Sequence, residues 1–305
     1  GLLVLALIAL IAGLVLHSFI IGANVNDWWK GRSVTPVDQI ATSLAISRMC
    51  AQCATSIFLL RTTFLLMRNL DSYISLFIMV VFYDFFSYAN ICLTSLLSIV
   101  YCLKISNFHT RLFLYLRRVI VHRTVHFTVG SVLLSTFSCF IPLLMTIIEL
   151  TKGGTYNTTM ADLSSDSHNK YVVYIYIIGD FFPLLFYYIS SAILFISWYH
   201  HTTNIEMSSN VSINLETYYS VMKCISFTFT YNTLYFIVGC VGIFYYSVYC
   251  VSLDWLLIVL EFLPALHSFH LFYRTNKLRR QMSKGLQNVM HFLIHNKNAE
   301  TRDNI

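Results

Sequence analysis

The first stretch of the chain, GLLVLALIALIAGLVLHSFIIGA at residues 1–23, contains no formally charged side chain. A helix needs about 20 mostly apolar residues to cross the roughly 30 Å hydrocarbon layer of a bilayer. A secretory signal has a shorter apolar region that is followed by a cleavage site of small residues. We therefore interpret this run as a first membrane helix that also targets the chain and is retained.

The rest of the sequence repeats this pattern. Of the 305 residues, 57% are hydrophobic and only 11% are charged, whereas a soluble domain carries about 25% charged residues. The predicted spans are 1–23, 38–60, 74–103, 125–149, 171–199, 218–246 and 251–273. Each run is too long and too uniformly apolar for the alternating strands of a membrane barrel. The sequence thus predicts an all-α membrane protein, with a seven-transmembrane helix bundle at 1–273 and a basic tail at 274–305.

The orientation in the membrane follows from the positions of lysine and arginine, which are enriched in cytoplasmic segments. The segments after the first and third runs, together with the tail, hold 14 of these residues, and the opposite side holds four. We therefore predict an extracellular N-terminus and a cytoplasmic tail. Asn157 begins the sequon Asn-Thr-Thr, which this topology places outside, so Asn157 is a predicted glycosylation site.

A few ionisable side chains fall inside the apolar runs, where they cost several kcal/mol and usually face the bundle interior. Arg48 lies about ten residues into the second run and is interpreted as a structural hub or a conformational switch, two roles that are compatible. Asp84, Asp180 and Glu261 lie at similar predicted depth on three helices. They line an outward-facing cavity for small organic molecules, or they face water or make interhelical hydrogen bonds.

Motifs for other functions are weak or missing. The sequence has no Gly-rich phosphate loop, no HExxH and no nucleophile elbow, so we expect no enzyme activity, cofactor, metal or nucleic-acid partner. Cys50 and Cys53 form a C-x-x-C that elsewhere suggests redox or zinc chemistry, but within a membrane helix packing is the simpler interpretation. The basic segment 104–123 is suited to anionic membrane lipids or to a docking partner. Pro183 allows a kink that can act as a hinge.

Several short motifs occur in the order found in one receptor family. Residues 44–48 read L-A-I-S-R, residues 103–108 read L-K-I-S-N-F, residues 194–197 are followed by His201, and residues 267–269 read H-S-F. This pattern resembles the bitter-taste receptors (taste receptor type 2), a family of G-protein-coupled receptors. The D-R-Y and N-P-x-x-Y motifs of ordinary rhodopsin-like receptors are absent from the sequence.

The sequence also departs from that family. Leu16-His17 replaces the usual G-N of the first helix, and residues 217–223 differ at the start of the sixth helix. Cys92 stands where the family often has a tryptophan implicated in ligand contact. These changes put the ligand range, the packing of the first two helices and the basal activity in question.

The resemblance implies a plasma-membrane chemoreceptor that binds bitter small molecules from outside and activates a gustducin-type heterotrimeric G protein. The alternatives are a vomeronasal type 1-like pheromone receptor, a small transporter or channel, and a structural scaffold. The predicted ligand-binding residues are Asp84, Asn90, Cys92, Asp180 and Glu261. The predicted structural or switch residues are Arg48, Ser47, Pro183, His267 and Ser268, and those of the G-protein side are Lys104, Arg117 and His201.

Overall fold

The computed structural model describes residues 2–64, 70–105, 111–151, 181–197, 199, 215–249, 254–275, 278–284, 287 and 290. The regular secondary structure of these residues is entirely helical. The labelled helices are α1 Leu2–Trp29, α2 Pro36–Phe64, α3 Leu70–Ile105, α4 Arg111–His122, α5 Thr124–Thr151, α7 Leu215–Tyr249 and α8 Asp254–Arg274. A further apolar helix, Phe181–Ser197, lies between α5 and α7 in the chain.

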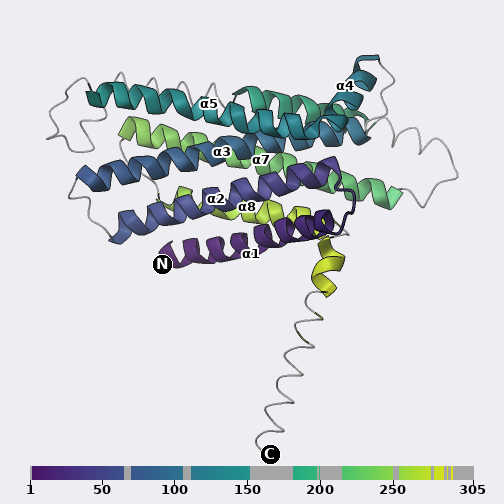
Figure 1. Cartoon of the computed structure of the whole chain (residues 1–305), viewed down its shortest axis with the longest axis horizontal. Coiled ribbons are helices and arrows are strands. Elements are labelled where there is room, and N and C mark those ends of the chain that lie inside the picture. The colour runs from purple at the N-terminus through teal and green to yellow at the C-terminus, as the bar shows by residue number, and fades with distance from the viewer. Residues whose placement is uncertain are drawn as a thin grey trace, which may run out of the picture.

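The long helices lie side by side, and the chain reverses direction between successive helices (Figure 1). α2 packs against α1 and α3, α3 packs against α5, and α8 packs against α1, α2 and α7. Contact between α1 and α8 brings the two ends of the helical array together. The helices therefore form a closed bundle.

Five of the described helices contain a segment long and apolar enough to cross a membrane: Val4–Trp29, Pro36–Arg61, Ile78–Lys104, Thr124–Ile141 and Trp255–Tyr273. α7 has 35 residues, more than the roughly 20 that a span requires, and Phe181–Ser197 belongs to the predicted fifth span. Large apolar side chains such as Val15 and Phe137 point outward, where a lipid environment would surround them. The predicted seven-helix membrane bundle is confirmed.

Five helices, α1, α2, α3, α5 and α7, are longer than the apolar runs that predict them. α1 continues to Trp29 and α3 begins at Leu70, because apolarity marks only the hydrocarbon layer and a helix continues through the headgroup layers. α4 has 12 residues, about 18 Å of helix, so it is too short to span. It forms within the basic segment 104–123, which lies between the predicted third and fourth spans. The predicted residues 171–180 lie outside the described part of the chain.

The turn between α1 and α2 follows from two local signals. Gly31 has φ 68°, and the amides of Gly31 and Arg32 bond to the carbonyls of Trp28 and Asp27 at 3.0 Å each, which is the Schellman pattern that ends a helix. α2 then begins with Pro at its first position, a favoured place for Pro. These signals fix where the two helices meet.

The start of α2 also has a reciprocal cap. The Thr35 hydroxyl accepts from the Asp38 amide at 3.2 Å, and the Asp38 carboxylate accepts from the Thr35 amide at 3.3 Å. This arrangement satisfies two amides that would otherwise lack partners at a helix start. The Asp38 carboxylate is thereby committed to the fold.

Apolar packing joins the helices toward the end of the bundle where α2 begins and α3 ends. One buried cluster joins α2 and α3 and includes Ile40, Leu44, Leu93 and Leu97. A second cluster joins α1 and α2 to Phe272 of α8 and to Leu278. Residues 278–284 are helical, so the beginning of the predicted tail is packed onto the bundle.

A buried polar site between α2, α3, α7 and α8

Arg48 of α2 is the centre of a buried hydrogen-bonded cluster. Its side chain is only 1% exposed, although a guanidinium stays charged under ordinary conditions. Its Nε donates to Oδ1 of Asn90 at 2.8 Å, and its Nη1 lies 2.8 Å from Nδ1 of His267 and 3.0 Å from Oγ of Ser268. Because a guanidinium can only donate, Nδ1 of His267 must be the acceptor. The imidazole therefore carries its proton on Nε2.

An aromatic side chain completes this cluster. The Tyr231 ring of α7 lies with its centroid 5.7 Å from Cζ of Arg48, within the range of a cation–π contact. The same ring stacks on His267 at 4.5 Å between centroids. We call Arg48, Asn90, Tyr231, His267 and Ser268 the Arg48 cluster. Its members come from α2, α3, α7 and α8, so one side chain joins four helices.

A neighbouring contact holds α2 against α3. The Ser47 hydroxyl donates to the carbonyl of Phe86 at 2.7 Å, and Ser47 is buried. The bond uses a carbonyl of α3, so it strengthens the same pair of helices that the Arg48–Asn90 bond joins.

Glu261 of α8 makes a second set of contacts with α2. Ser56 donates to its carboxylate Oε1 at 2.9 Å, and the Gln52 amide donates to its main-chain carbonyl at 2.9 Å. Glu261 is 2% exposed. The Gln52 side chain lies against Gly13 of α1, where a Cβ atom would collide with it. The glycine thus allows α1 to approach α2 closely.

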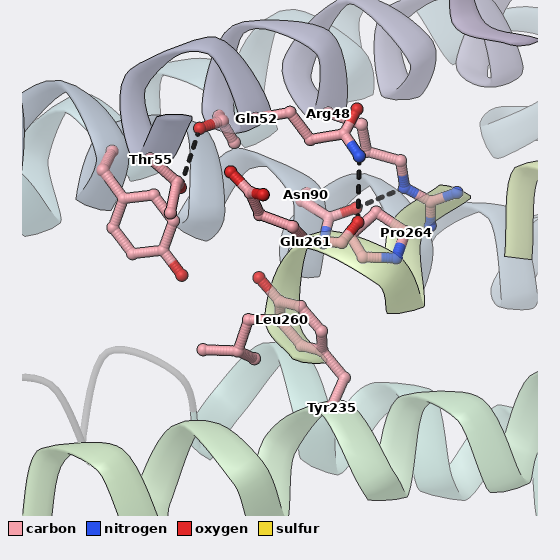
Figure 2. A pocket seen from close by; sticks show the side chains of 10 residues that line it. Arg48, Gln52, Thr55, Asn90, Tyr235, Leu260, Glu261 and Pro264 are labelled. Carbon is pink, nitrogen blue, oxygen red and sulfur yellow. Dashed lines mark hydrogen bonds between the residues drawn. The ribbon is translucent and has the colours of Figure 1, made fainter. Parts of the chain in front are cut away.

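Some of these polar side chains, Arg48, Gln52, Asn90 and Glu261, line a small cavity (Figure 2). Its walls are Arg48, Ala51, Gln52, Thr55, Tyr83, Asn90, Tyr235, Leu260, Glu261 and Pro264. Its volume is about 10 Å³, room for about one water molecule. Sites for small organic ligands have about 300–1,000 Å³, so this conformation is closed to such a ligand.

Three polar atoms from the walls are buried without a hydrogen-bond partner among the described residues: Nη2 of Arg48, Oε1 of Gln52 and Oε2 of Glu261. They include one end of a guanidinium and one oxygen of a carboxyl. A group that enters the cavity therefore meets a donor and two acceptors. Such walls suit a polar ligand group better than a purely apolar one.

The structure brings two of the predicted ligand-binding residues to this cavity, Asn90 and Glu261. Asp84 is half-buried on α3 and Cys92 is buried, and neither is among the residues that line the cavity. Asp180 lies outside the described residues. Of the two predicted acids that the structure describes, Asp84 and Glu261, only Glu261 lines the cavity.

The remaining predicted residues fall into two groups. Lys104 lies in the last turn of α3 and Arg117 lies on α4, and both are exposed. α4 and the end of α3 lie at the same end of the bundle (Figure 1). Pro183 is buried near the start of the Phe181–Ser197 helix. His201 and Asn157 lie outside the described residues.

Sequence reasoning missed several residues of the site. Arg48, Gln52 and Ser56 are spaced four apart, which places them on one face of a helix, so their shared orientation was present as a signal. Gly13, Tyr231 and Tyr235 gave no comparable signal. Their role depends on which helices are neighbours, and a single sequence does not contain that information.

Closely packed membrane helices, an exterior of apolar side chains and a buried polar centre joining four helices are typical of a seven-helix membrane receptor. The family model of the taste receptor protein (TAS2R) matches residues 1–290. The chain therefore belongs to the taste receptor family, and the predicted resemblance is confirmed. It is a multi-pass membrane receptor and not an enzyme.

Individual relatives agree with this family. Taste receptor type 2 member 16 of Pan troglodytes is 25% identical over 240 residues, which cover 73% of this chain and 76% of that protein. The Homo sapiens protein of the same name gives the same figures. Taste receptor type 2 member 4 of Homo sapiens is 30% identical over 128 residues, which cover 41% of this chain and 42% of that protein.

Proposed function

We propose that this taste receptor is a plasma-membrane chemoreceptor that binds bitter small molecules from the extracellular side and activates a gustducin-type heterotrimeric G protein. The observation that carries the proposal is that Arg48 and Asn90 line the cavity and also belong to the cluster that joins four helices. A ligand group in the cavity therefore acts on the contacts that hold the bundle together.

The distribution of charge supports an extracellular N-terminus. Arg32 lies at the α1–α2 turn, Lys104 lies near the end of α3, and exposed arginines lie on α4. These segments, together with the described basic residues after α8, Arg279, Arg280 and Lys284, lie at one end of the bundle (Figure 1). Positive side chains favour the cytoplasmic side. Glycosylation of Asn157, measured as an enzyme-sensitive mass shift that Asn157→Gln abolishes, tests this orientation.

The proposed mechanism is a shift between two populations of the bundle. The cavity of about 10 Å³ belongs to a closed state, and an agonist favours a state in which the helices stand further apart. To move the balance from 1:99 to 99:1, the agonist needs about 5.5 kcal/mol of preference for the open state. Proposed ligand contacts are Asp84, Asn90, Cys92, Asp180 and Glu261, and Lys104, Arg117 and His201 are proposed for the G-protein side.

The proposal is tested by expressing the chain in cells with a gustducin-containing G protein and recording calcium during a panel of bitter compounds. We expect a concentration-dependent response to at least one compound. Silence across a broad panel, with receptor confirmed at the cell surface, contradicts the proposal.

A matched pair of variants then tests the site. Glu261→Gln removes a carboxylate of the cavity wall, and we expect the agonist concentration for half-maximal response to shift about tenfold or more, because a hydrogen bond to a charged group contributes about 1.5–3 kcal/mol. Phe262→Leu changes a neighbouring α8 side chain that is 38% exposed on the exterior and should leave potency unchanged. Equal loss of surface receptor and signal in Glu261→Gln, with unchanged potency, assigns Glu261 a structural role only.

The family match sets aside the vomeronasal alternative. A transporter would need an open polar path, whereas the cavity at the described centre of the bundle holds about one water. Substrate flux into liposomes that contain the purified receptor would favour the transporter.

A further inference from the structure

A second, larger pocket lies where α1 and α2 meet the helical residues after α8. Its volume is about 440 Å³, which is within the range of small-molecule sites. The lining residues are Asp27, Arg32, Ser33, Thr35, Asp38, Arg280, Gln281 and Lys284. We call it the terminal pocket, because these segments meet at one end of the bundle (Figure 1).

The acidic residues of the terminal pocket are engaged by the fold itself. Asp27 is buried, with 5% of its side chain exposed, and its Oδ1 accepts from Nη1 of Arg32 at 3.1 Å. Gln281 also approaches both carboxylate oxygens of Asp27 at 3.4 Å. Asp38 caps the start of α2. Neither carboxylate is therefore placed primarily to bind a cation in the pocket.

The basic residues are placed differently. Arg280 and Lys284 are exposed and lie four residues apart, which puts them on one face of a helix. The Arg32 side chain is 66% exposed although it is paired with Asp27. With the Ser33 hydroxyl, these three cations give the pocket several donors for a single anionic group.

The neighbouring tryptophans place the pocket at the membrane surface. Trp28 is 71% exposed and Trp29 is 84% exposed, and both directly follow Asp27 at the end of α1. Tryptophan is enriched at the level of lipid headgroups. A phosphate group in the terminal pocket would therefore lie at the depth of the headgroups.

We propose that the terminal pocket binds a phosphate-bearing headgroup, with Arg280 and Lys284 as its main cationic contacts. The α1–α2 turn and the segment after α8 are separate in sequence and both line the pocket, so a bound phosphate holds them together. The ligand is either a phosphorylated membrane lipid or a free phosphorylated molecule of the same headgroup chemistry. This inference does not depend on the bitter ligand or on G-protein coupling.

The test uses the full chain, purified in a neutral detergent, and follows its thermal unfolding during titration. The probes are short-chain phosphatidylinositol 4,5-bisphosphate, short-chain phosphatidylcholine and inositol trisphosphate. We expect the phosphoinositide to raise the Tm in a saturable way, because a ligand that binds the folded state stabilises it, and phosphatidylcholine to have no such effect. Stabilisation by inositol trisphosphate at the same concentrations identifies a free phosphate as a sufficient ligand; stabilisation by the lipid alone identifies the lipid.

Two double variants show whether the pocket is the site. Arg280→Gln/Lys284→Gln should weaken the apparent affinity about 25-fold, since each cation near an anionic headgroup contributes about fivefold. Lys284→Gln alone should weaken it about fivefold. Arg111→Gln/Arg118→Gln removes two exposed cations of α4 and should leave the affinity unchanged. Absence of saturable stabilisation, or equal weakening by both double variants, overturns the proposal.

Discussion

The Arg48–Asn90 hydrogen bond gives the sharpest test of the buried site. Asn90→Ala removes the acceptor of a 2.8 Å bond whose donor is a guanidinium only 1% exposed. A hydrogen bond to a charged group contributes about 1.5–3 kcal/mol, and a buried donor left without its partner costs a similar amount. At about 2.1 cal/mol/K of unfolding entropy per residue, each kcal/mol shifts the Tm of this 305-residue chain by about 1.6 °C. The Tm of the purified receptor should therefore fall by roughly 2–5 °C.

Thr94→Val is the matched control for this change. Thr94 lies one turn further along α3, is 4% exposed, and its hydroxyl has no hydrogen-bond partner among the described residues. Its nearly isosteric replacement removes no hydrogen bond, so the Tm should not fall. A second control makes Asn90→Ala in a receptor that carries Arg48→Met. There the change removes the same side-chain volume but no hydrogen bond to position 48.

The reasoning is refuted if Asn90→Ala lowers the Tm no more than Thr94→Val does. It is also refuted if the loss from Asn90→Ala is the same with Met at position 48 as with Arg. Should Arg48→Met yield no folded receptor, the comparison between the two α3 variants still decides the question.

Two further changes test the packing around the cluster. Gly13→Ala should destabilise the receptor by about 1–3 kcal/mol of overpacking and so lower the Tm, because its Cβ would collide with Gln52. Gly22→Ala, which has open space around it, should be neutral or slightly stabilising. Tyr231→Phe keeps the ring beside Arg48 and should unfold near the wild-type Tm, whereas Tyr231→Leu loses a cation–π contact of about 0.5–2 kcal/mol; equal Tm values for the two variants would exclude a contribution from the ring.

Membrane helices could be predicted from the sequence because lipid imposes a length and an apolar composition on each span. The same reasoning identified Arg48 as a buried hub, since an unpaired guanidinium deep in a span is costly. It did not give the ends of α1 and α3, because those turns lie in the headgroup layers where apolarity no longer marks a helix.

The candidate site was only partly predictable, for a related reason. Depth along a helix can be counted from the sequence, and the prediction of Glu261 rests partly on depth. The direction in which a side chain points depends on helix rotation and on the identity of the neighbouring helix. Asp84 shares the predicted depth of Glu261, yet it is not among the residues that line the cavity.

Under the proposed function, the cavity and the Arg48 cluster are two parts of one energetic balance. A cavity of about 10 Å³ must widen to hold a ligand, and its walls belong to helices that Arg48 joins. A contact made only in the closed state weakens agonist binding. The free energy by which it does so equals the free energy by which the bound agonist weakens the contact. Ser268→Ala removes one bond of Nη1 at 3.0 Å and should therefore lower the Tm and raise basal calcium signalling at equal surface level. A purely structural bond predicts a different result, in which Tm and signalling fall together.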